Sequence, residues 1–169
     1  MGNILVTGSS GLIGSEAVEH FDRQGRSIVG VDNNLRREFF GSAGDTTWNL
    51  ERLKRSTSNF RHYDLDIRDR DGIMALFRQN SISLVIHCAA QPSHDKARDI
   101  PLTDFEVNAL GTLNLLEEVS AAGIDTFIFT STTSVFGLAL TPSSGEPAAW
   151  ITEEVVPAPR NIFHLRRTS

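Results

Sequence analysis

The turn near the amino terminus constrains the fold of this chain more than any other feature. An apolar run at residues 4–6 leads into glycines at positions 8, 11 and 14, and an amphipathic helix is expected to follow. Each glycine has a use in a phosphate-binding turn. Gly8 lets the strand turn sharply, Gly11 lets backbone amides approach a pyrophosphate, and Gly14 lets the helix pack closely on the strand. A pyrophosphate would then lie at the positive end of the helix dipole.

A glycine triplet alone is also compatible with an ordinary turn, so the flanking sequence decides between the two interpretations. The expected helix ends at Gly25 and carries four apolar residues along one side: Ile13, Ala17, Val18 and Phe21. A second apolar strand, expected at residues 27–31, stops at Asp32. An acid at that position can accept hydrogen bonds from the ribose of adenosine. The sequence therefore predicts a dinucleotide site.

Asp32 also bears on which dinucleotide binds. A carboxylate at this position repels the additional phosphate of NADP and favours the free hydroxyl of NAD. Arg36 and Arg37 follow closely. A guanidinium there can accommodate that phosphate, or both arginines can be solvated charges on a loop. NAD is the predicted cofactor.

Composition excludes several other classes of protein. The chain has 169 residues, of which 40% are hydrophobic and 22% charged, as in a single globular domain. The formal net charge of -5 argues against nucleic acid as a partner. Cys88 is the only cysteine, and the five histidines lack the spacing of a metal site. With no apolar stretch long enough to span a bilayer and no leader-like amino terminus, we expect a cytoplasmic protein without a membrane or metal partner.

Strands alternate with helices along the chain. Further strands are expected at residues 60–65, 84–88 and 126–130, and the longest helix at 102–122. Residues 33–58 are expected to form an irregular surface excursion with a short helix near 48–55. This alternation predicts an α/β fold, a Rossmann-type parallel sheet with helices on both faces, truncated after strand five. Residues 1–137 form the expected NAD-binding domain, and 138–169 an irregular tail.

Six motifs in order resemble one family, the extended short-chain dehydrogenases/reductases that include NAD-dependent nucleotide-sugar epimerases and dehydratases. The similarity runs from Ile4 to about Gly137 and rests on these segments: TGSSGLIG at 7–14, DNN at 32–34, DLDIRD at 64–69, HCAAQ at 87–91, VNALGT at 107–112 and STTSVFG at 131–137. Within the family, residues 39–50 and 90–95 look most similar to CDP-paratose 2-epimerases.

The resemblance implies a role in NAD binding for Gly8, Ser10, Gly11, Leu12, Ile13, Asp32, Asn33, Asp66, Ile67, Ala89, Ala90, Gln91 and Asn108. In this set Asp66 and Ile67 hold the adenine, and Ala89 and Ala90 lie behind the cofactor. Asn108 either anchors a cofactor loop or is a helical polar residue satisfied by a neighbouring turn. Residues 91–96 either contact substrate, as in the family, or serve loop structure.

The catalytic residues depart from the family pattern. Thr132 matches the active-site Ser/Thr, but the family also uses a tyrosine base and a lysine four residues later. The best match for these two positions places Phe163 and Arg167 there. Phe163 has no proton to transfer, and a positioned general base typically contributes a factor of roughly 10²–10⁴ in rate. His164 is the neighbouring candidate base, but adjacent helical residues point about 100° apart.

These observations predict the NAD-binding portion of a nucleotide-sugar epimerase or dehydratase, in a truncated and catalytically impaired product. A CDP-sugar is expected to bind only if a substrate domain is supplied. The alternative is a non-catalytic NAD-binding sensor, or a subunit that a partner chain completes. The apolar strand at 126–130 would be an open sheet edge, so self-association or a homo-oligomer is expected there.

Overall fold

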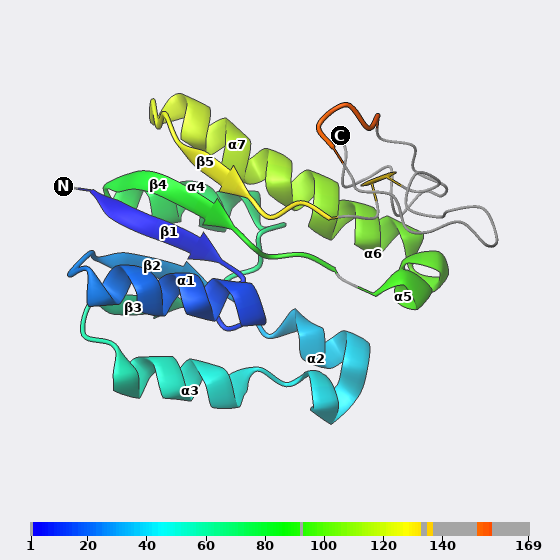
Figure 1. The fold of residues 1–169 in the computed structure, drawn as a ribbon, viewed down its shortest axis with the longest axis horizontal. Coiled ribbons are helices and arrows are strands. Elements are labelled where there is room, and N and C mark those ends of the chain that lie inside the picture. Colours follow the sequence, from blue (N-terminus) through cyan, green and yellow to red (C-terminus); the bar gives the residue numbers. More distant parts are fainter. Residues whose placement is uncertain (1, 92, 133–134, 137–151, 157–169) are drawn as a thin grey trace.

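A computed structural model of the chain describes residues 2–91, 93–132, 135–136 and 152–156. Its centre is a parallel sheet of five strands in the order β3-β2-β1-β4-β5 (Figure 1). The strands are β1 (Asn3–Thr7), β2 (Ile28–Val31), β3 (Phe60–Tyr63), β4 (Ile82–His87) and β5 (Phe127–Phe129). The predicted Rossmann-type α/β fold is confirmed, and each of the five strands lies where the apolar runs placed it, with ends that differ by one to two residues.

Helices cover both faces of the sheet, and each face has its own apolar core. On one face α1 (Leu12–Arg23) and α3 (Thr47–Ser56) lie together, and on the other α4 (Arg70–Gln79) and α7 (Gly111–Ala121) lie together (Figure 1). Alternation along β1 divides its side chains between the faces, because successive residues of a strand point to opposite sides. Leu5 belongs to the core under α4 and α7, whereas Ile4 and Val6 belong to the core under α1 and α3.

The segment between β2 and α3 is more ordered than the sequence indicated. It contains α2 (Leu35–Phe40) and a short 3₁₀ helix, η1 (Gly41–Gly44), before α3 begins. Asn34, in the left-handed region with φ 56°, accepts hydrogen bonds at its side-chain oxygen from the amide of Thr46 at 2.9 Å and from its hydroxyl at 3.0 Å. The short helix predicted near 48–55 is confirmed as α3, but the prediction of irregular structure is wrong at residues 35–44, which form α2 and η1.

The long helix predicted at 102–122 is present as three consecutive pieces. These are α6 (Pro101–Phe105), a π-helical turn η2 (Glu106–Leu110), and α7. A further helix, α5 (His94–Asp99), follows β4 in a region expected to be a loop; its N-cap Ser93 accepts a hydrogen bond from the amide of Lys96 at 3.2 Å. The expected boundary at 137/138, and all of the tail except residues 152–156, lie outside the described residues. None of the helices in the described ranges has both the length and the apolar character that crossing a bilayer requires.

Candidate functional site

A cleft of about 280 Å³ opens at the carboxyl ends of β1 to β5, where ligands bind in open parallel sheets. Most of its lining comes from the loops that follow these strands. The lining residues are Gly8, Gly11, Leu12, Ile13, Gly14, Val31, Asp32, Asn33, Leu35, Arg36, Thr46, Leu65, Asp66, Ile67, Cys88, Ala89, Ala90, Val107 and Thr130. Most of the residues predicted to bind NAD are among them.

The glycine turn forms one end of the cleft. Gly8 has φ +64°, and its amide donates to the carbonyl of Val31 at 2.8 Å. A Cβ on Gly14 would lie 2.1 Å from the carbonyl oxygen of Gly8, so only glycine permits this approach of helix to strand. Within the described residues, the amides of Leu12 and Ile13 donate to no acceptor, and the first turn of α1 has no acidic residue. The turn thus fits a pyrophosphate.

Asp32 lies beside this turn at the end of β2. Its Oδ2 accepts a hydrogen bond from the amide of Ser10 at 3.0 Å, and its Oδ1 accepts one from the amide of Asn34 at 2.8 Å. Each carboxylate oxygen keeps acceptor capacity beyond these two bonds, as a ribose diol requires. Ser10 itself lines a smaller neighbouring hollow of about 220 Å³, which shares Asp32, Asn33 and Thr46 with the cleft.

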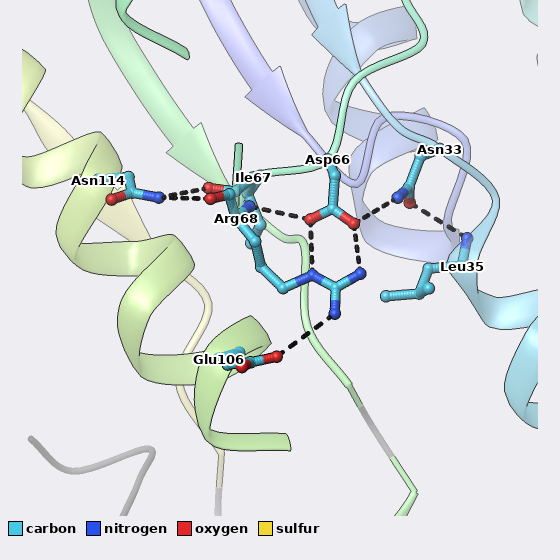
Figure 2. A network of polar contacts seen from close by, with 7 residues as sticks. All are labelled: Asn33, Leu35, Asp66, Ile67, Arg68, Glu106 and Asn114. Atoms are coloured by element: carbon cyan, nitrogen blue, oxygen red, sulfur yellow. Dashed lines mark hydrogen bonds and ion pairs between the residues drawn. The ribbon is translucent and has the colours of Figure 1, made fainter. Parts of the chain in front are cut away.

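The other end of the cleft is built around Asp66 (Figure 2). Oδ1 of Asp66 accepts from the amide of Arg68 at 2.9 Å and from its Nε at 3.0 Å. Oδ2 accepts from Nη2 of Arg68 at 2.6 Å and from Nδ2 of Asn33 at 2.9 Å. Partial burial acts to raise the pKa of Asp66, but the bonds and charge of Arg68, with the bond from Asn33, hold that pKa below its usual value.

Three apolar residues of the lining, Leu35, Leu65 and Val107, were not recognised from the sequence, whereas Ile67 was. Leu35, Leu65, Ile67 and Val107 line the cleft from the start of α2, the loop after β3 and η2, and these four residues are called the apolar slot below. A Cβ on Gly111 would lie 2.6 Å from the Ile67 side chain, so this glycine makes room for Ile67 against the helix. Leu35 and Leu65 each lie close in sequence to an acid or amide at a strand end. This position could have identified them as lining residues of the cleft.

A buried histidine supports the loop after β4. Nδ1 of His87 lies 2.6 Å from Oγ1 of Thr7, and Nε2 lies 3.0 Å from Oγ1 of Thr112. The Thr112 hydroxyl donates to the carbonyl of Asn108 at 2.8 Å, so it accepts from Nε2–H, and Nδ1 accepts from Thr7. Oγ1 of Thr7 in turn accepts from the amide of Ala89 at 3.2 Å. The chain of bonds positions Ala89, which lines the cleft as predicted.

Gln91 and Asn108 do not line the cleft; they belong to a buried polar cluster behind it. The amide of Gln91 donates to Oδ1 of Asn108 at 3.0 Å, and Nδ2 of Asn108 donates to the carbonyl of Gln91 at 3.3 Å. Both side chains also donate to Oδ1 of Asp104, at 2.8 Å from Gln91 and 3.0 Å from Asn108. These bonds tie Asn108 to the backbone of the loop after β4, and its role toward a cofactor stays a prediction.

The predicted catalytic residues are mostly outside the site as described. Thr132 is half-buried just after β5 but is not among the lining residues, whereas Thr130 is. Phe163 and Arg167 lie outside the described residues. In the described part of the chain, no group of three or more His, Cys, Asp or Glu could hold a metal ion.

The two arginines after Asp32 have different surroundings. Nη1 of Arg37 lies 3.3 Å from Oδ2 of Asp45, away from the cleft lining. The guanidinium of Arg36 lies over the ring of Phe40, 4.7 Å from its centre, and Arg36 lines the cleft. Only Arg36 is therefore placed where a phosphate of the ligand could reach it.

Comparisons with known proteins agree with this geometry. UDP-glucuronate 4-epimerase of Thermodesulfobacterium geofontis is 36% identical over 139 residues, which cover 80% of this chain and 41% of that protein. The structure of UDP-glucose-4-epimerase from Stenotrophomonas maltophila with bound NAD and formylated UDP-arabinopyranose superposes with a TM-score of 0.80 and 28% identity, covering 99% of this chain and 46% of that one. UDP-glucose 4-epimerase of Thermus thermophilus in complex with NAD gives a TM-score of 0.76 and 30% identity, over 98% of this chain and 47% of that one.

The chain thus spans less than half the length of these relatives. The model of one family matches residues 4–164, nearly the whole chain. Together with the parallel sheet and the glycine turn, this match shows that the chain belongs to the NAD dependent epimerase/dehydratase family.

Proposed function

We propose that this chain binds NAD and forms the cofactor-binding part of a nucleotide-sugar epimerase or dehydratase. The observation that carries the proposal is the phosphate end of the cleft, where the first amides of α1 have no acceptor among the described residues and Asp32 stands alongside. Gly11 keeps the approach to these amides free of a side chain, Gly8 and Gly14 allow the close backbone packing of the turn, and the apolar slot offers adenine an apolar surface. When bound, NAD supplies an acceptor and donor of hydride for a sugar carbon.

NAD is proposed over NADP because of Asp32 and its neighbours. The smaller hollow beside Asp32 is also lined by Asp64 and contains no lysine or arginine among its lining residues. A second carboxylate there disfavours an additional phosphate on the ribose. Arg36 lines the cleft, and its positive charge would instead attract the additional phosphate of NADP.

A titration of the purified chain with NADH, followed by nicotinamide fluorescence, tests the proposal. Asp32→Asn removes a charged acceptor, and a hydrogen bond to a charged group contributes roughly 1.5–3 kcal/mol, so we expect affinity to fall about 10- to 100-fold. Asp71→Asn, on the exposed side of α4 and outside the cleft, is the matched control and should leave affinity unchanged. Absence of NADH binding by the unmodified chain would overturn the proposal.

We infer further that hydride transfer is impaired in this chain. Phe163 and Arg167 stand where the family resemblance expects tyrosine and lysine. Losing a positioned general base lowers the rate by roughly 10²–10⁴. Incubation with NAD and a UDP-sugar should leave the sugar unchanged when the products are separated by chromatography, whereas a full-length UDP-glucose 4-epimerase, the positive control, should convert its UDP-sugar to the 4-epimer. The resemblance of residues 39–50 and 90–95 makes a CDP-sugar the second substrate to test. Formation of an epimer from either sugar at the rate of a full-length enzyme would contradict impairment.

A second candidate function is an NAD-binding subunit or sensor that another chain completes. In the described sheet β5 is the edge strand, and its Ile128 is 46% exposed. We propose that this edge associates with a second copy or a partner chain. A cytoplasmic location, expected from the sequence, stays a prediction.

A further inference from the structure

The loop after β4 is fixed through the backbone amides of two of its residues. The amide of Ala89 donates to Oγ1 of Thr7 at 3.2 Å. The amide of Gln91 donates to Oδ1 of Asn108 at 3.0 Å. Between them, the amide of Ala90 donates to no acceptor in the described ranges, and Ala90 lines the cleft. The loop thus offers one backbone donor, and the residues on both sides of it are held in place.

The loop after β4 lies on the opposite side of the glycine turn from Asp32. In the sheet order β3-β2-β1-β4-β5, Asp32 follows β2 and the glycine turn follows β1. Cys88, Ala89 and Ala90 line the cleft after β4, and Thr130 lines it after β5. If Asp32 binds the ribose of adenosine and the turn binds the pyrophosphate, the nicotinamide half of NAD extends over the loop after β4.

A buried carboxylate holds the far end of this loop. Oδ1 of Asp104 accepts a hydrogen bond from Nε2 of Gln91 at 2.8 Å and another from Nδ2 of Asn108 at 3.0 Å. Nε2 of Gln91 also donates to the carbonyl of Ser93 at 3.0 Å, and the amide of Ser93 donates to Oε1 of Gln91 at 2.5 Å. The side chains of Asp104 and Gln91 are fully buried, and a hydrogen bond is stronger in the protein interior than in water.

The other fixed amide of the loop is connected to the same helical turn. Oγ1 of Thr7, which accepts from Ala89, donates to Nδ1 of His87 at 2.6 Å. Nε2 of His87 donates to Oγ1 of Thr112 at 3.0 Å, and this hydroxyl donates to the carbonyl of Asn108 at 2.8 Å. Both held amides therefore lead to Asn108, in the π-helical turn η2. Single π-helical turns within α-helices occur frequently at functional sites.

The helical segment that carries Asp104 is anchored independently of this polar cluster. Asp104 lies on α6, and η2 follows with Val107, which is buried in the core under α4 and α7. On α7, Nδ2 of Asn114 donates to the carbonyls of Ile67 and Arg68 at 3.0 and 3.2 Å (Figure 2). Loss of the Asp104 carboxylate is therefore expected to release the loop after β4 and to leave the helix in place.

We propose that Asp104 is a positioning residue for the nicotinamide half of NAD: its buried carboxylate fixes the loop after β4 through the side chains of Gln91 and Asn108. The inference rests on the proposed NAD site and goes beyond it, because it assigns a role in cofactor binding to a residue that does not line the cleft. A loop that is held before the ligand arrives does not have to be ordered on binding, and this increases affinity.

Two ligands separate the nicotinamide half from the rest of the cofactor. NADH, followed by its fluorescence, contains both halves, whereas ADP, followed by calorimetry, contains only the adenosine and phosphate part. We expect Asp104→Leu to weaken NADH binding about tenfold, as loss of a charged hydrogen bond does, and to leave the ADP affinity unchanged. A role confined to folding would reduce the binding of both ligands alike, so equal losses overturn the proposal.

A conservative variant and a matched control accompany this measurement. Asp104→Asn keeps the shape of the side chain and an acceptor oxygen. Because hydrogen bonds to a charged group are roughly twice as strong as neutral ones, this variant should lose only about threefold in NADH affinity. Asp99→Asn is the control, because Asp99 lies 58% exposed at the end of α5, next to Arg98, and outside the cleft. It should bind both ligands as the unmodified chain does.

A double-mutant cycle tests whether Asp104 acts through Gln91. Gln91→Met keeps the length of the side chain and removes its two polar atoms. If Asp104 holds the loop through Gln91, the NADH affinity of the double variant with Asp104→Leu falls by less than the product of the two single losses. Losses that multiply would mean that the two residues act independently, and they contradict the proposal.

The outcomes also distinguish this inference from the proposed function. An unmodified chain that binds neither NADH nor ADP removes both. Normal binding of both ligands by the unmodified chain, with an unchanged NADH affinity in Asp104→Leu, removes only the role of Asp104. Should Asp104→Leu fail to fold, Asp104→Asn decides, and an unchanged NADH affinity in that variant has the same meaning.

Discussion

Gly11 and Gly14 stand in the same turn, yet different contacts require the absence of a side chain at each. A Cβ on Gly14 would lie 2.1 Å from the carbonyl oxygen of Gly8, a backbone atom that cannot yield. A Cβ on Gly11 would lie 3.2 Å from the same oxygen, and its φ of -76° is one that alanine adopts readily. Gly11 therefore serves the ligand, and Gly14 serves the packing of α1 on β1.

This difference predicts opposite phenotypes for two alanine variants. Gly14→Ala should destabilise the fold by about 1–3 kcal/mol, the usual cost of forced overpacking. Gly11→Ala should change the free energy of unfolding by less than this and should weaken NADH binding, because its methyl group projects near the phosphate amides. Urea denaturation and NADH titration of both variants check the pair. A Gly11→Ala variant with normal NADH affinity would place the pyrophosphate elsewhere.

Asp45 makes a pH-dependent contribution to stability. Hydrogen bonds from the side chain and backbone of Thr47 and from Asn34, together with the charge of Arg37, lower its pKa from 3.8 to about 2. A carboxyl with a depressed pKa in the folded state stabilises the protein above its unfolded pKa. We expect this contribution to be complete above about pH 5 and to be lost progressively as pH falls through 3.8 toward about 2.

The unfolding free energies of the unmodified chain and Asp45→Asn, measured across this range, isolate the effect. Their difference should shrink as the pH falls, since asparagine does not titrate. Asp66, whose pKa is also lowered, is present in both proteins and cancels in the difference. A difference that stays constant with pH would show that Asp45 is not held by these bonds.

At the scale of elements, the segment that joins β2 to α3 depends on one residue, Asn34. Its side-chain oxygen accepts two hydrogen bonds from Thr46, and its Nδ2 donates to Asp45 at 2.9 Å. Its own amide donates to Asp32, so the closure of this segment also fixes the carboxylate proposed to bind ribose. The φ of 56° suits asparagine or glycine and strains alanine.

Two substitutions separate the stability that the side-chain bonds of Asn34 contribute from the strain of its left-handed backbone conformation. Asn34→Gly loses only the side-chain bonds, whereas Asn34→Ala also introduces strain of about 1–2 kcal/mol. We expect Asn34→Ala to unfold at a lower denaturant concentration than Asn34→Gly, and both to bind NADH more weakly than the unmodified chain. Equal stability of the two variants would contradict the left-handed conformation at this position.

The elements that the sequence predicted well share one property, apolar residues arranged as their secondary structure requires. β1 and β4 bury consecutive residues, as strands covered by helices on both faces do, and α1 packs Ala17, Val18 and Phe21 against the core at helical spacing. The segment at 33–58 lacks such an arrangement. It is held by hydrogen bonds between Asn34 and Thr46, and a pair of polar residues 12 positions apart leaves no recognisable pattern in the sequence.

The candidate site divides in a similar way. Its glycines and Asp32 were recognisable because each follows a strand and meets a chemical need of the ligand. Leu65 and Val107 reach the cleft from a loop and a helix, and only the folded arrangement brings them together. The four donors that surround Asp66 were also beyond a sequence argument, since Asn33 is 33 residues away along the chain. The sequence thus indicated where the cleft would lie but not the contacts that hold it open.

At the scale of the whole molecule, two of the exposed apolar surfaces in the described residues bear on association with another chain. One is the β5 edge, with Ile128 46% exposed. The other is a stripe on α6 and α7, where Leu102, Phe105, Leu113 and Leu116 are 69%, 50%, 51% and 42% exposed. Exposed apolar surface of this extent favours association with another chain. An edge strand adds unpaired backbone groups that can extend a sheet.

Two substitutions, each of which introduces a lysine on one of these surfaces, determine which surface drives self-association. If the β5 edge pairs with a second copy, Ile128→Lys should abolish concentration-dependent oligomers in sedimentation velocity, because a lysine on an edge strand blocks further pairing. Leu116→Lys introduces the same charge at a similar exposure, 42% against 46%, but on α7, and should leave the oligomers in place. Neither Ile128 nor Leu116 lines the cleft, so NADH affinity serves as the check that both variants are folded. The reverse result, with oligomers lost only in Leu116→Lys, would assign the interface to the helical stripe and leave the β5 edge without the role proposed for it.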